Sequence, residues 1–277
     1  MNDDSFLGRM ARRSRERVAD ARHLESDDDL RARAMATPSP PDLTLGEFDL
    51  IAELKLRSPA AGSLATSDFD RCSQLTAYAA GGAAAISVLT EPDEFKGDLA
   101  HLQEAASILQ PQNTPTMRKD FITNPYQVYE ARAAGAAGIL VIVTMLSDEE
   151  TETLLACAHE CGLFVLLEAF DAQDLSRIAT LTGPRQASEN APVLCGVNCR
   201  NLKTLAVDFD RFAALAEHLP AGLVAVAESG ITGAEEVRAI AQMGYHAALV
   251  GSALMQSQQP QQAVAELIAT GTAQYAE

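Results

Sequence analysis

The chain has 277 residues, a length that suits one large α/β domain or two small ones. Its formal net charge of −17 at pH 7 argues against nucleic acid and anionic membrane surfaces as partners, because phosphate groups attract basic surfaces. Hydrophobic residues make up 47% of the chain but aromatic residues only 5%, so the core is expected to consist of Ala, Leu, Val and Ile.

The N-terminal segment, residues 1–45, is predicted to form a helical extension followed by a linker. Apolar side chains between Phe6 and Ala21 recur with roughly helical spacing, which predicts a solvated helix with one apolar stripe. The acidic run Glu25–Leu30 interrupts this pattern, and the segment PSPP at residues 38–41 predicts an extended linker. The main domain is therefore expected to span residues 46–277.

From Leu50 onward, short apolar, β-prone segments alternate with helical stretches. The strands are expected to begin near residues 51, 83, 114, 137, 163, 192, 223 and 247. The helices are expected over residues 69–80, 99–109, 125–134, 148–161, 171–181, 208–218, 233–243 and 261–269. Ser147, Asp171 and Thr232 are expected to cap three of them. Repeated strand–helix units predict an α/β protein of the (β/α)8 TIM-barrel class with an extra N-terminal helical segment.

An open, doubly wound sheet is the alternative architecture. That fold normally carries a glycine-rich phosphate-binding turn after its first strand. The corresponding segment here is SPAAG at residues 58–62, which lacks the G-x-G-x-x-G pattern. The barrel is therefore favoured.

The first predicted strand, LIAELKL at residues 50–56, carries two charged residues among apolar ones. Glu53 and Lys55 are two positions apart, so their side chains point to the same face. Buried opposite charges are costly unless they are paired or needed for chemistry. The pair is consistent with an active site at the mouth of a barrel, or with a single ion pair on an edge strand.

Polar residues and two glycines lie near the carboxyl ends of the other strands. They are Ser87, Thr90, Glu91, Arg118, Lys119, Asp120, Thr144, Glu168, Asn198, Arg200, Glu228, Ser229, Gly230, Gly251 and Ser252. In a barrel these ends meet at one rim, so the acidic and basic members are expected to surround one pocket. Because strand side chains alternate, Lys119 is expected to face opposite to Arg118 and Asp120, which would then pair outside the pocket.

Two glycine-containing turns follow the seventh and eighth strands, in ESGITGAEE and VGSALM. In barrels the loops at these positions often hold a phosphate with backbone N–H groups and a helix N-terminus. Ser252 adds a hydroxyl there, and Ser58 after the first strand adds another. The turns predict a phosphorylated small-molecule ligand, with ordinary βα turns as the alternative.

The cysteine pattern and the absence of a targeting signal argue for a cytoplasmic protein with reduced thiols. There are five Cys, an odd number, and the Arg-rich start of the chain has no apolar run like that of a signal peptide. Neither Cys157 and Cys161 nor Cys195 and Cys199 have the spacing of common zinc sites, so no metal is expected. No apolar run reaches the length of a membrane span.

Five segments together resemble the indole-3-glycerol phosphate synthase family. They are AELKLRSP, AISVLTEPDEFKG, RKDFITNPYQVYEAR, GVNCRNLKT and AESGI, and the resemblance extends in order from about Ile51 to Met255. It implies a tryptophan-biosynthesis lyase of the carboxy-lyase type. Such an enzyme closes the ring of 1-(2-carboxyphenylamino)-1-deoxyribulose 5-phosphate with loss of CO₂ and water. The resemblance also implies no metal and no organic cofactor, and we expect a monomer or a weak homo-oligomer.

The resemblance further implies roles for individual residues. Lys119 matches the general acid that protonates the substrate carbonyl, and Lys55 matches a lysine that could be a second acid. Glu53 and Glu168 match the carboxylates that hold and deprotonate intermediates, with Glu168 favoured as the base in dehydration. The remaining positions would support the substrate and its charges (Asn198, Arg200 and Glu228) or hold its phosphate (Ser58, Ser229, Gly230, Gly251 and Ser252).

Several positions depart from the family's usual pattern. Ala60 and Ala61 replace a hydroxyl and a cation in the first loop, and Leu56 stands where a basic or small residue is usual. Phe170 stands in place of a histidine, Cys199 in place of an asparagine, and Ser252-Ala253 in place of Glu-Ser. None of these changes removes a proposed catalytic residue. They leave room for an altered substrate affinity or a paralogue with another substrate.

Two other functions remain open at this stage. A phosphoribosyl anthranilate isomerase would favour a Cys and Asp pair as acid and base, whereas the first strand here carries Glu53 and Lys55. A non-catalytic binding or regulatory barrel would be expected to lose at least one of Lys119, Glu53 and Glu168, and all three are present.

Overall fold

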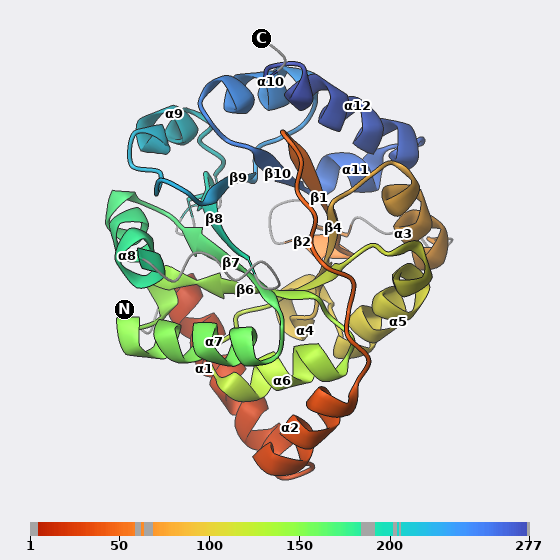
Figure 1. Ribbon diagram of the computed structural model, residues 1–277, viewed down its shortest axis with the longest axis vertical. Helices are drawn as coiled ribbons and strands as arrows, with labels where there is room; N and C mark the ends of the chain where they lie inside the picture. Colours follow the sequence, from red (N-terminus) through yellow and green to blue (C-terminus); the bar gives the residue numbers. More distant parts are fainter. Residues whose placement is uncertain are drawn as a thin grey trace.

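The central feature of the computed structural model is a closed barrel of parallel strands in the order β1-β10-β9-β8-β7-β6-β5-β4. The residues that the structure describes are 5–58, 62–63, 69–183, 192–201, 204 and 206–275, without the side chain of Ser58. Figure 1 shows the strands at the centre with the helices around them, which is a TIM barrel. The fold class predicted from the alternating segments is confirmed.

The eight barrel strands coincide with the eight predicted ones. Their bounds are β1 Asp49–Leu54, β4 Ala85–Leu89, β5 Thr116–Lys119, β6 Gly138–Ile142, β7 Phe164–Ala169, β8 Val193–Asn198, β9 Val224–Glu228 and β10 Ala247–Val250. The first strand pairs with β10 on one side and β4 on the other, so it is not an edge strand. Glu53 of β1 is therefore a charged residue inside the barrel, and the edge-strand alternative is wrong.

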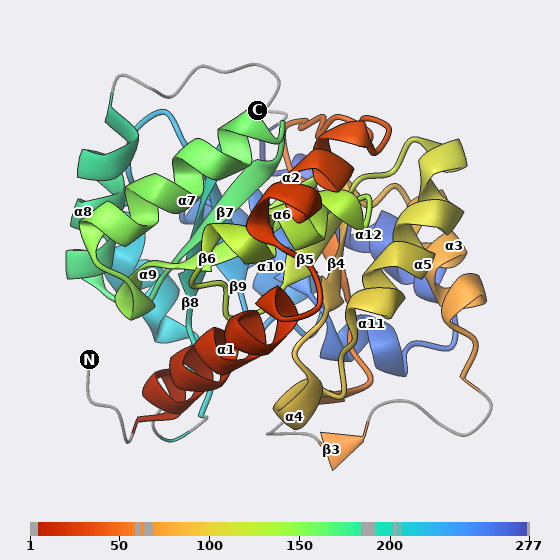
Figure 2. The same cartoon turned by 90° about the horizontal axis from the view of Figure 1, so that it is seen from below.

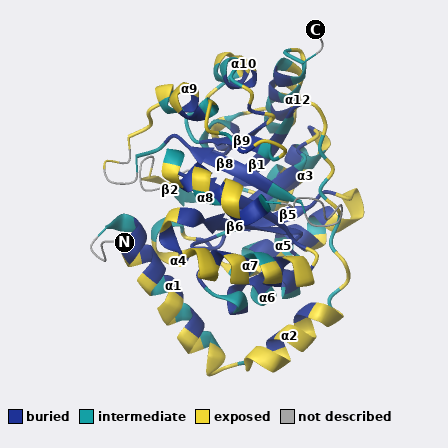
Figure 3. Cartoon of the chain, turned by 60° about the vertical axis from the view of Figure 1, so that its left-hand side comes forward, coloured by how far each residue is buried: buried dark blue, intermediate teal, exposed yellow. Residues whose placement is uncertain are grey.

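Helices cover the outside of the barrel, each burying one face against it. They are α3 Arg71–Ala80, α5 Leu99–Leu109, α6 Pro125–Ala133, α7 Asp148–Glu160, α8 Ala172–Thr182, α9 Asp210–Ala216, α10 Ala234–Gln242 and α12 Pro260–Thr272. Figure 3 shows buried strands enclosed by helices whose outer faces are exposed, as the amphipathic pattern requires. None of the helices in the described ranges has the length and apolar character that a membrane crossing needs.

Short elements that the sequence pattern did not reveal lie in the connections. They are the hairpin strands β2 Arg57–Ser58 and β3 Gly62–Ser63, the helices α4 Pro92–Phe95 and α11 Ser252–Gln256, and the 3₁₀ turns η1 Gln110–Gln112 and η2 Val143–Met145. Each is shorter than two helical turns and therefore too short to show a hydrophobic period. Two of them, α4 and α11, contribute residues to the cavity described below.

The helix caps follow the sequence at two of three predicted positions. Ser147 forms a reciprocal capping box with Glu150, and Asp171 accepts a hydrogen bond from the backbone N–H of Asp174. Thr232 is not a cap, because α10 begins after Gly233 and the Thr232 hydroxyl donates to Glu236 at 3.0 Å instead.

The N-terminal extension contains two helices, α1 Phe6–Arg22 and α2 Asp27–Ala36. The acidic run was expected only to end the helical pattern, but three aspartates form the first turn of α2, which Ser26 caps. Negative charge is favourable at a helix N-terminus, so these residues begin a helix. Residues 38–48 then connect α2 to the barrel without helix or strand, as expected of the proline-rich segment.

Candidate active site

A cavity of about 580 Å³ opens at the carboxyl ends of the barrel strands. Eleven of the twelve site residues expected from the sequence line it: Glu53, Lys55, Lys119, Glu168, Asn198, Arg200, Glu228, Ser229, Gly230, Gly251 and Ser252. The twelfth is Ser58, whose side chain lies outside the described part of the chain. The structure therefore brings together these residues from six strand ends or the loops that follow them.

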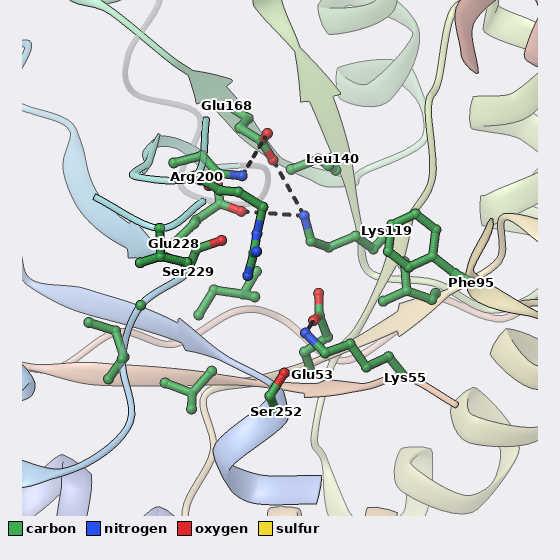
Figure 4. A pocket seen from close by; sticks show the side chains of 18 of the residues that line it. Glu53, Lys55, Phe95, Lys119, Leu140, Glu168, Arg200, Glu228, Ser229 and Ser252 are labelled. Carbon is green, nitrogen blue, oxygen red and sulfur yellow. Dashed lines mark hydrogen bonds and ion pairs between the residues drawn. The ribbon is translucent and has the colours of Figure 1, made fainter. Parts of the chain in front are cut away.

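Lys119 is held between two carboxylates. Its Nζ lies 3.4 Å from Glu168 Oε2 and 3.3 Å from Glu228 Oε2, as the dashed lines in Figure 4 show. Burial by itself lowers the pKa of Lys119, but the surrounding carboxylates, Glu168 and Glu228 foremost, offset this effect and raise it. The amine is therefore a fully protonated cation at neutral pH.

Glu228 is the most deeply enclosed of the three carboxyl groups. Burial and the neighbouring Glu168 raise its pKa well above that of an ordinary glutamic acid, although Lys119 opposes the shift. Its Oε1 is buried and lacks a hydrogen-bond partner among the described residues. That oxygen occupies the space where a side chain at position 196 would project, so only Gly196 fits beside it. Glu228 thus retains its proton to a higher pH than an isolated glutamic acid does.

Glu53 and Lys55 form an ion pair on the opposite side of the cavity. Lys55 Nζ donates to Glu53 Oε1 at 2.7 Å. Burial by itself would raise the pKa of Glu53, but the charges of Lys55 and Lys119 outweigh it and lower that pKa. A Cβ at Gly251 would lie 2.6 Å from Glu53 Oε1 and 2.8 Å from Lys55 Nζ, so the absence of a side chain there leaves room for the pair.

The end of β8 supplies an amide and a guanidinium. Asn198 Nδ2 donates to Glu168 Oε1 at 3.1 Å, which fixes the orientation of that carboxylate. Asn198 Oδ1 accepts from the backbone N–H of Arg200 at 2.9 Å. Arg200 also pairs with Val207 across the loop, and its side chain extends into the centre of the cavity in Figure 4.

The turns after β9 and β10 form one end of the cavity. Ser229 and Gly230 have φ angles of 70° and 72°, which is unusual for Ser229 because it carries a side chain. Gly251 and Ser252 follow β10, and Ser252 begins the short helix α11. Consecutive backbone groups in such turns can present N–H donors to an anion, which suits the phosphate site that the sequence predicts.

An apolar wall of the cavity was not predicted. It includes Phe6 and Leu7 from α1, Phe95 from α4 and Phe121 after β5. The ring centroids of Phe6 and Phe121 are 5.9 Å apart, and those of Phe95 and Phe121 are 6.3 Å apart. The apolar stripe of α1 was visible in the sequence, but nothing in it showed that the stripe reaches the barrel mouth.

Of the two residues beside Lys119, Arg118 is directed away from the cavity, as predicted, whereas Asp120 also lines it. Arg118 Nη2 donates to Asp120 Oδ2 at 3.1 Å, and Arg118 Nη1 donates to Glu130 Oε2 at 2.9 Å. Arg118 and Asp120 are both buried. Alternation along β5 thus directs the Lys119 amine into the cavity and the Arg118 guanidinium away from it.

The positions that depart from the family pattern lie in different surroundings. Ala253 lines the cavity, whereas Phe170 does not and donates its backbone N–H to Asp174 instead. Cys199 is buried with its sulfur against Gly230. Ala60 and Ala61 lie outside the described residues. Within the described residues, no three His, Cys, Asp or Glu side chains gather as metal ligands.

Sequence comparisons place the chain among known proteins. The profile of the indole-3-glycerol phosphate synthase family matches residues 7–267. An indole-3-glycerol phosphate synthase from a Nocardioides species is 43% identical, covering 89% of this chain and 92% of its own. One from Mycolicibacterium gilvum is 40% identical, covering 88% and 86%.

Solved structures share the fold at low sequence identity. A 3-hexulose-6-phosphate synthase from Salmonella typhimurium has a TM-score of 0.63 and 13% identity, covering 82% of this chain and 100% of its own. A thiamine phosphate pyrophosphorylase from Pyrococcus furiosus has a TM-score of 0.58 and 14% identity, covering 82% and 97%. These two support the barrel alone. By its sequence profile and its relatives, the chain belongs to the indole-3-glycerol phosphate synthase family.

Proposed function

We propose that this protein converts 1-(2-carboxyphenylamino)-1-deoxyribulose 5-phosphate into indole-3-glycerol phosphate, CO₂ and water, as a carboxy-lyase of tryptophan biosynthesis. The observation that carries the proposal is the position of Lys119 between Glu168 and Glu228, at the mouth of a barrel with an apolar wall on one side and glycine turns at one end. An amine between two carboxylates can both donate and regain a proton.

Ring closure is the first step. The ring carbon that bears the carboxylate forms a bond to the ketone carbon of the sugar, and the ketone oxygen takes a proton from Lys119 to become a hydroxyl. The carboxylates around Lys119 keep it protonated and in place for this transfer. Lys55 would be a second general acid on the opposite side of the cavity, where its ion pair with Glu53 holds it in place.

Decarboxylation and dehydration complete the reaction. The bond to the carboxylate breaks, CO₂ leaves and the electron pair returns to the ring, so aromaticity drives the step without an electron sink. Glu168 then takes a proton from the CH₂ carbon beside the nitrogen while the new hydroxyl leaves as water with a proton from a lysine. Asn198 holds Glu168 in position for this role.

Substrate binding would divide between the two ends of the cavity. The aromatic ring suits the wall formed by Phe6, Phe95 and Phe121, because aromatic rings bury large apolar areas. Arg200 is suited to the substrate carboxylate, since a guanidinium binds carboxylates with two hydrogen bonds. Gly230, Gly251 and Ser252 would hold the phosphate, together with Ser58 and Ser229.

The remaining properties follow from the same proposal. A biosynthetic enzyme with a small phosphorylated substrate and five free thiols suits the cytoplasm. We propose that it acts without a metal or an organic cofactor, because the proton transfers require only the lysines and glutamates described above. It would act as a monomer or a weak homo-oligomer.

The test is direct because the chain has no Trp. When the purified protein receives the carboxyphenylamino substrate, indole fluorescence should rise against a background without protein indole. A parallel sample should receive N-(5-phosphoribosyl)anthranilate, the substrate of the alternative isomerase. An indole signal with the first compound alone supports the proposal. Consumption of the second compound, or of neither, would contradict it.

A further inference from the structure

A buried charge network behind the catalytic rim connects the N-terminal helix to the strand that carries Lys119. Asp120 is the central residue of this network, with its carboxylate almost fully buried. Its Oδ2 accepts from Thr90 Oγ1 at 2.7 Å and from Arg118 Nη2 at 3.1 Å. Its Oδ1 accepts from Arg17 Nη2 at 2.7 Å and from the backbone N–H of Phe121 at 2.8 Å.

Arg17 therefore contacts the residue that directly follows Lys119, the proposed general acid, in the chain. Burial by itself would raise the pKa of Asp120, but Arg118 and Arg17 outweigh it and lower that pKa, so the group is an anion in the folded protein. Arg118, which belongs to β5, donates a hydrogen bond to Asp120 Oδ2, whereas Arg17 donates to Oδ1. Arg17 belongs to α1, which Figure 2 shows on the outside of the barrel, and its side chain donates to Asp120.

Arg17 also contacts a second part of the rim. Its Nη1 lies 3.8 Å from Oε1 of Glu91, whose side chain is fully buried. Glu91 accepts the backbone N–H groups of Asp93, Glu94 and Phe95 and so caps α4. The orientation of α4 determines where the ring of Phe95 meets the cavity. The Arg17 guanidinium thus contacts both Asp120, which follows Lys119 in the chain, and Glu91, which caps the helix that carries Phe95.

A further contact from the same helix reaches this region. The hydroxyl of Ser14 donates to the carbonyl oxygen of Phe121 at 2.5 Å, and Gln127 donates to Ser14 Oγ at 3.0 Å. Ser14 is fully buried. The segment Lys119–Phe121 is therefore held by α1 at a side chain and at the backbone.

We propose that Arg17 is a positioning residue for the proposed reaction: by bridging Asp120 and Glu91 it sets the placement of Lys119 and Phe95 relative to each other. The inference rests on the proposed function. Arg17 does not line the main cavity, so it acts through Asp120 and Glu91 rather than on the substrate. Misplacement of reacting groups by an ångström costs roughly 10²-fold in rate, so a residue at this distance can have a large effect.

The experiment compares Arg17→Ala, Arg17→Lys and Arg15→Ala in the full-length protein. Arg15 is the matched control, because it belongs to the same helix and pairs with the exposed Glu150 at 3.5 Å, and neither residue lines the cavity. Steady-state kcat and KM with the carboxyphenylamino substrate and the melting temperature are measured for each variant. We expect kcat of Arg17→Ala to fall about 10- to 100-fold, with a rise in KM. Arg17→Lys should recover part of kcat, and Arg15→Ala should stay within about twofold of wild type.

The outcomes separate positioning from stability and from the proposed function itself. If Arg17→Ala lowers the melting temperature but keeps wild-type kcat and KM, Arg17 is only structural and the inference is wrong. If Arg17→Ala fails to fold, Arg17→Lys decides: wild-type kcat overturns the inference, and a reduced kcat at normal melting temperature supports it. If wild-type protein yields no indole product, the proposed function fails first, before Arg17 is tested.

Discussion

Lys119 Nζ lies 3.4 Å from Glu168 Oε2, although the two residues are 49 positions apart in the chain and belong to different strands. The barrel brings them together, because β5 and β7 end at the same rim with β6 between them. An ammonium and a carboxylate at this separation can exchange roles as acid and base during one reaction.

Replacement of Lys119 tests the proposed acid. Lys119→Ala should lower kcat by roughly 10²–10⁴-fold, as expected for loss of a general acid. Lys119→Arg should remain nearly as slow, because a guanidinium keeps the positive charge but does not release its proton. Steady-state kinetics on both variants decides between the roles. Near-wild-type activity of the arginine variant would show that only the charge of Lys119 matters.

Glu168→Gln tests the proposed base. The amide keeps the shape and can still contact Asn198, but it cannot take a proton, so kcat should fall by roughly 10²–10⁴-fold. The melting temperature should change little, because the variant also removes the repulsion between Glu168 and Glu228. If kcat stays unchanged in this folded variant, the base is another group.

The Arg200 guanidinium is expected to act in binding rather than in proton transfer. Arg200→Ala should raise KM with a smaller change in kcat. A hydrogen bond to a charged group is worth about 1.5–3 kcal/mol, which corresponds to a rise of roughly 10- to 100-fold. An unchanged KM would remove Arg200 from the substrate site.

Gly251→Ala probes the space beside the Glu53–Lys55 pair. The added methyl would lie 2.6 Å from Glu53 Oε1, so one of the two charged groups must move. We expect kcat/KM to fall by up to roughly 10²-fold through misplacement. Gly46→Ala is the matched control, because its nearest neighbour is Asp49 Oδ1 at 3.9 Å and it does not line the cavity. Equal activities of the two variants would refute the steric argument.

The raised pKa of Glu228 predicts a pH-dependent cost to stability. A carboxyl group whose pKa is higher in the folded state binds its proton more tightly there. Glu228 therefore contributes to the free energy of unfolding below its unfolded-state pKa, and this contribution is lost as the pH rises through its folded-state pKa. Glu228→Gln cannot ionise, so its melting temperature should improve relative to wild type as the pH rises from the ordinary pKa of a glutamic acid towards the raised pKa of Glu228. A constant difference across that range would show that Glu228 has no raised pKa.

The fold was predictable because its signals are local and repeated. Each barrel strand is a short apolar run and each long helix has caps or an apolar face, so the rhythm from Ile51 to Ala269 identified the architecture. Most of the site followed from one rule, that parallel strands of a barrel end at one rim. Alternation on β5 also predicted that Arg118 and Asp120 would pair behind Lys119.

The parts that were missed depend on contacts between distant segments. Phe6 reaches the cavity only because α1 packs across the barrel mouth. The sequence does not predict this packing, because the irregular segment of residues 38–48 separates the N-terminal helices from the barrel. Helix α4 is only four residues long, and the cap that forms it comes from the buried Glu91. The perturbed pKa of Glu228 arises from burial beside Glu168, which a list of strand-end residues does not reveal.

The measurement that tests the central claim most directly is the stoichiometry of the reaction. The substrate is labelled with ¹³C in its carboxylate, and ¹³CO₂ and indole-3-glycerol phosphate are quantified together by mass spectrometry with wild-type protein and with Lys119→Ala. The account predicts equal amounts of the two products from the wild type and a strong reduction of both with the variant. Release of ¹³CO₂ without indole product, or equal product formation by the two proteins, would contradict it.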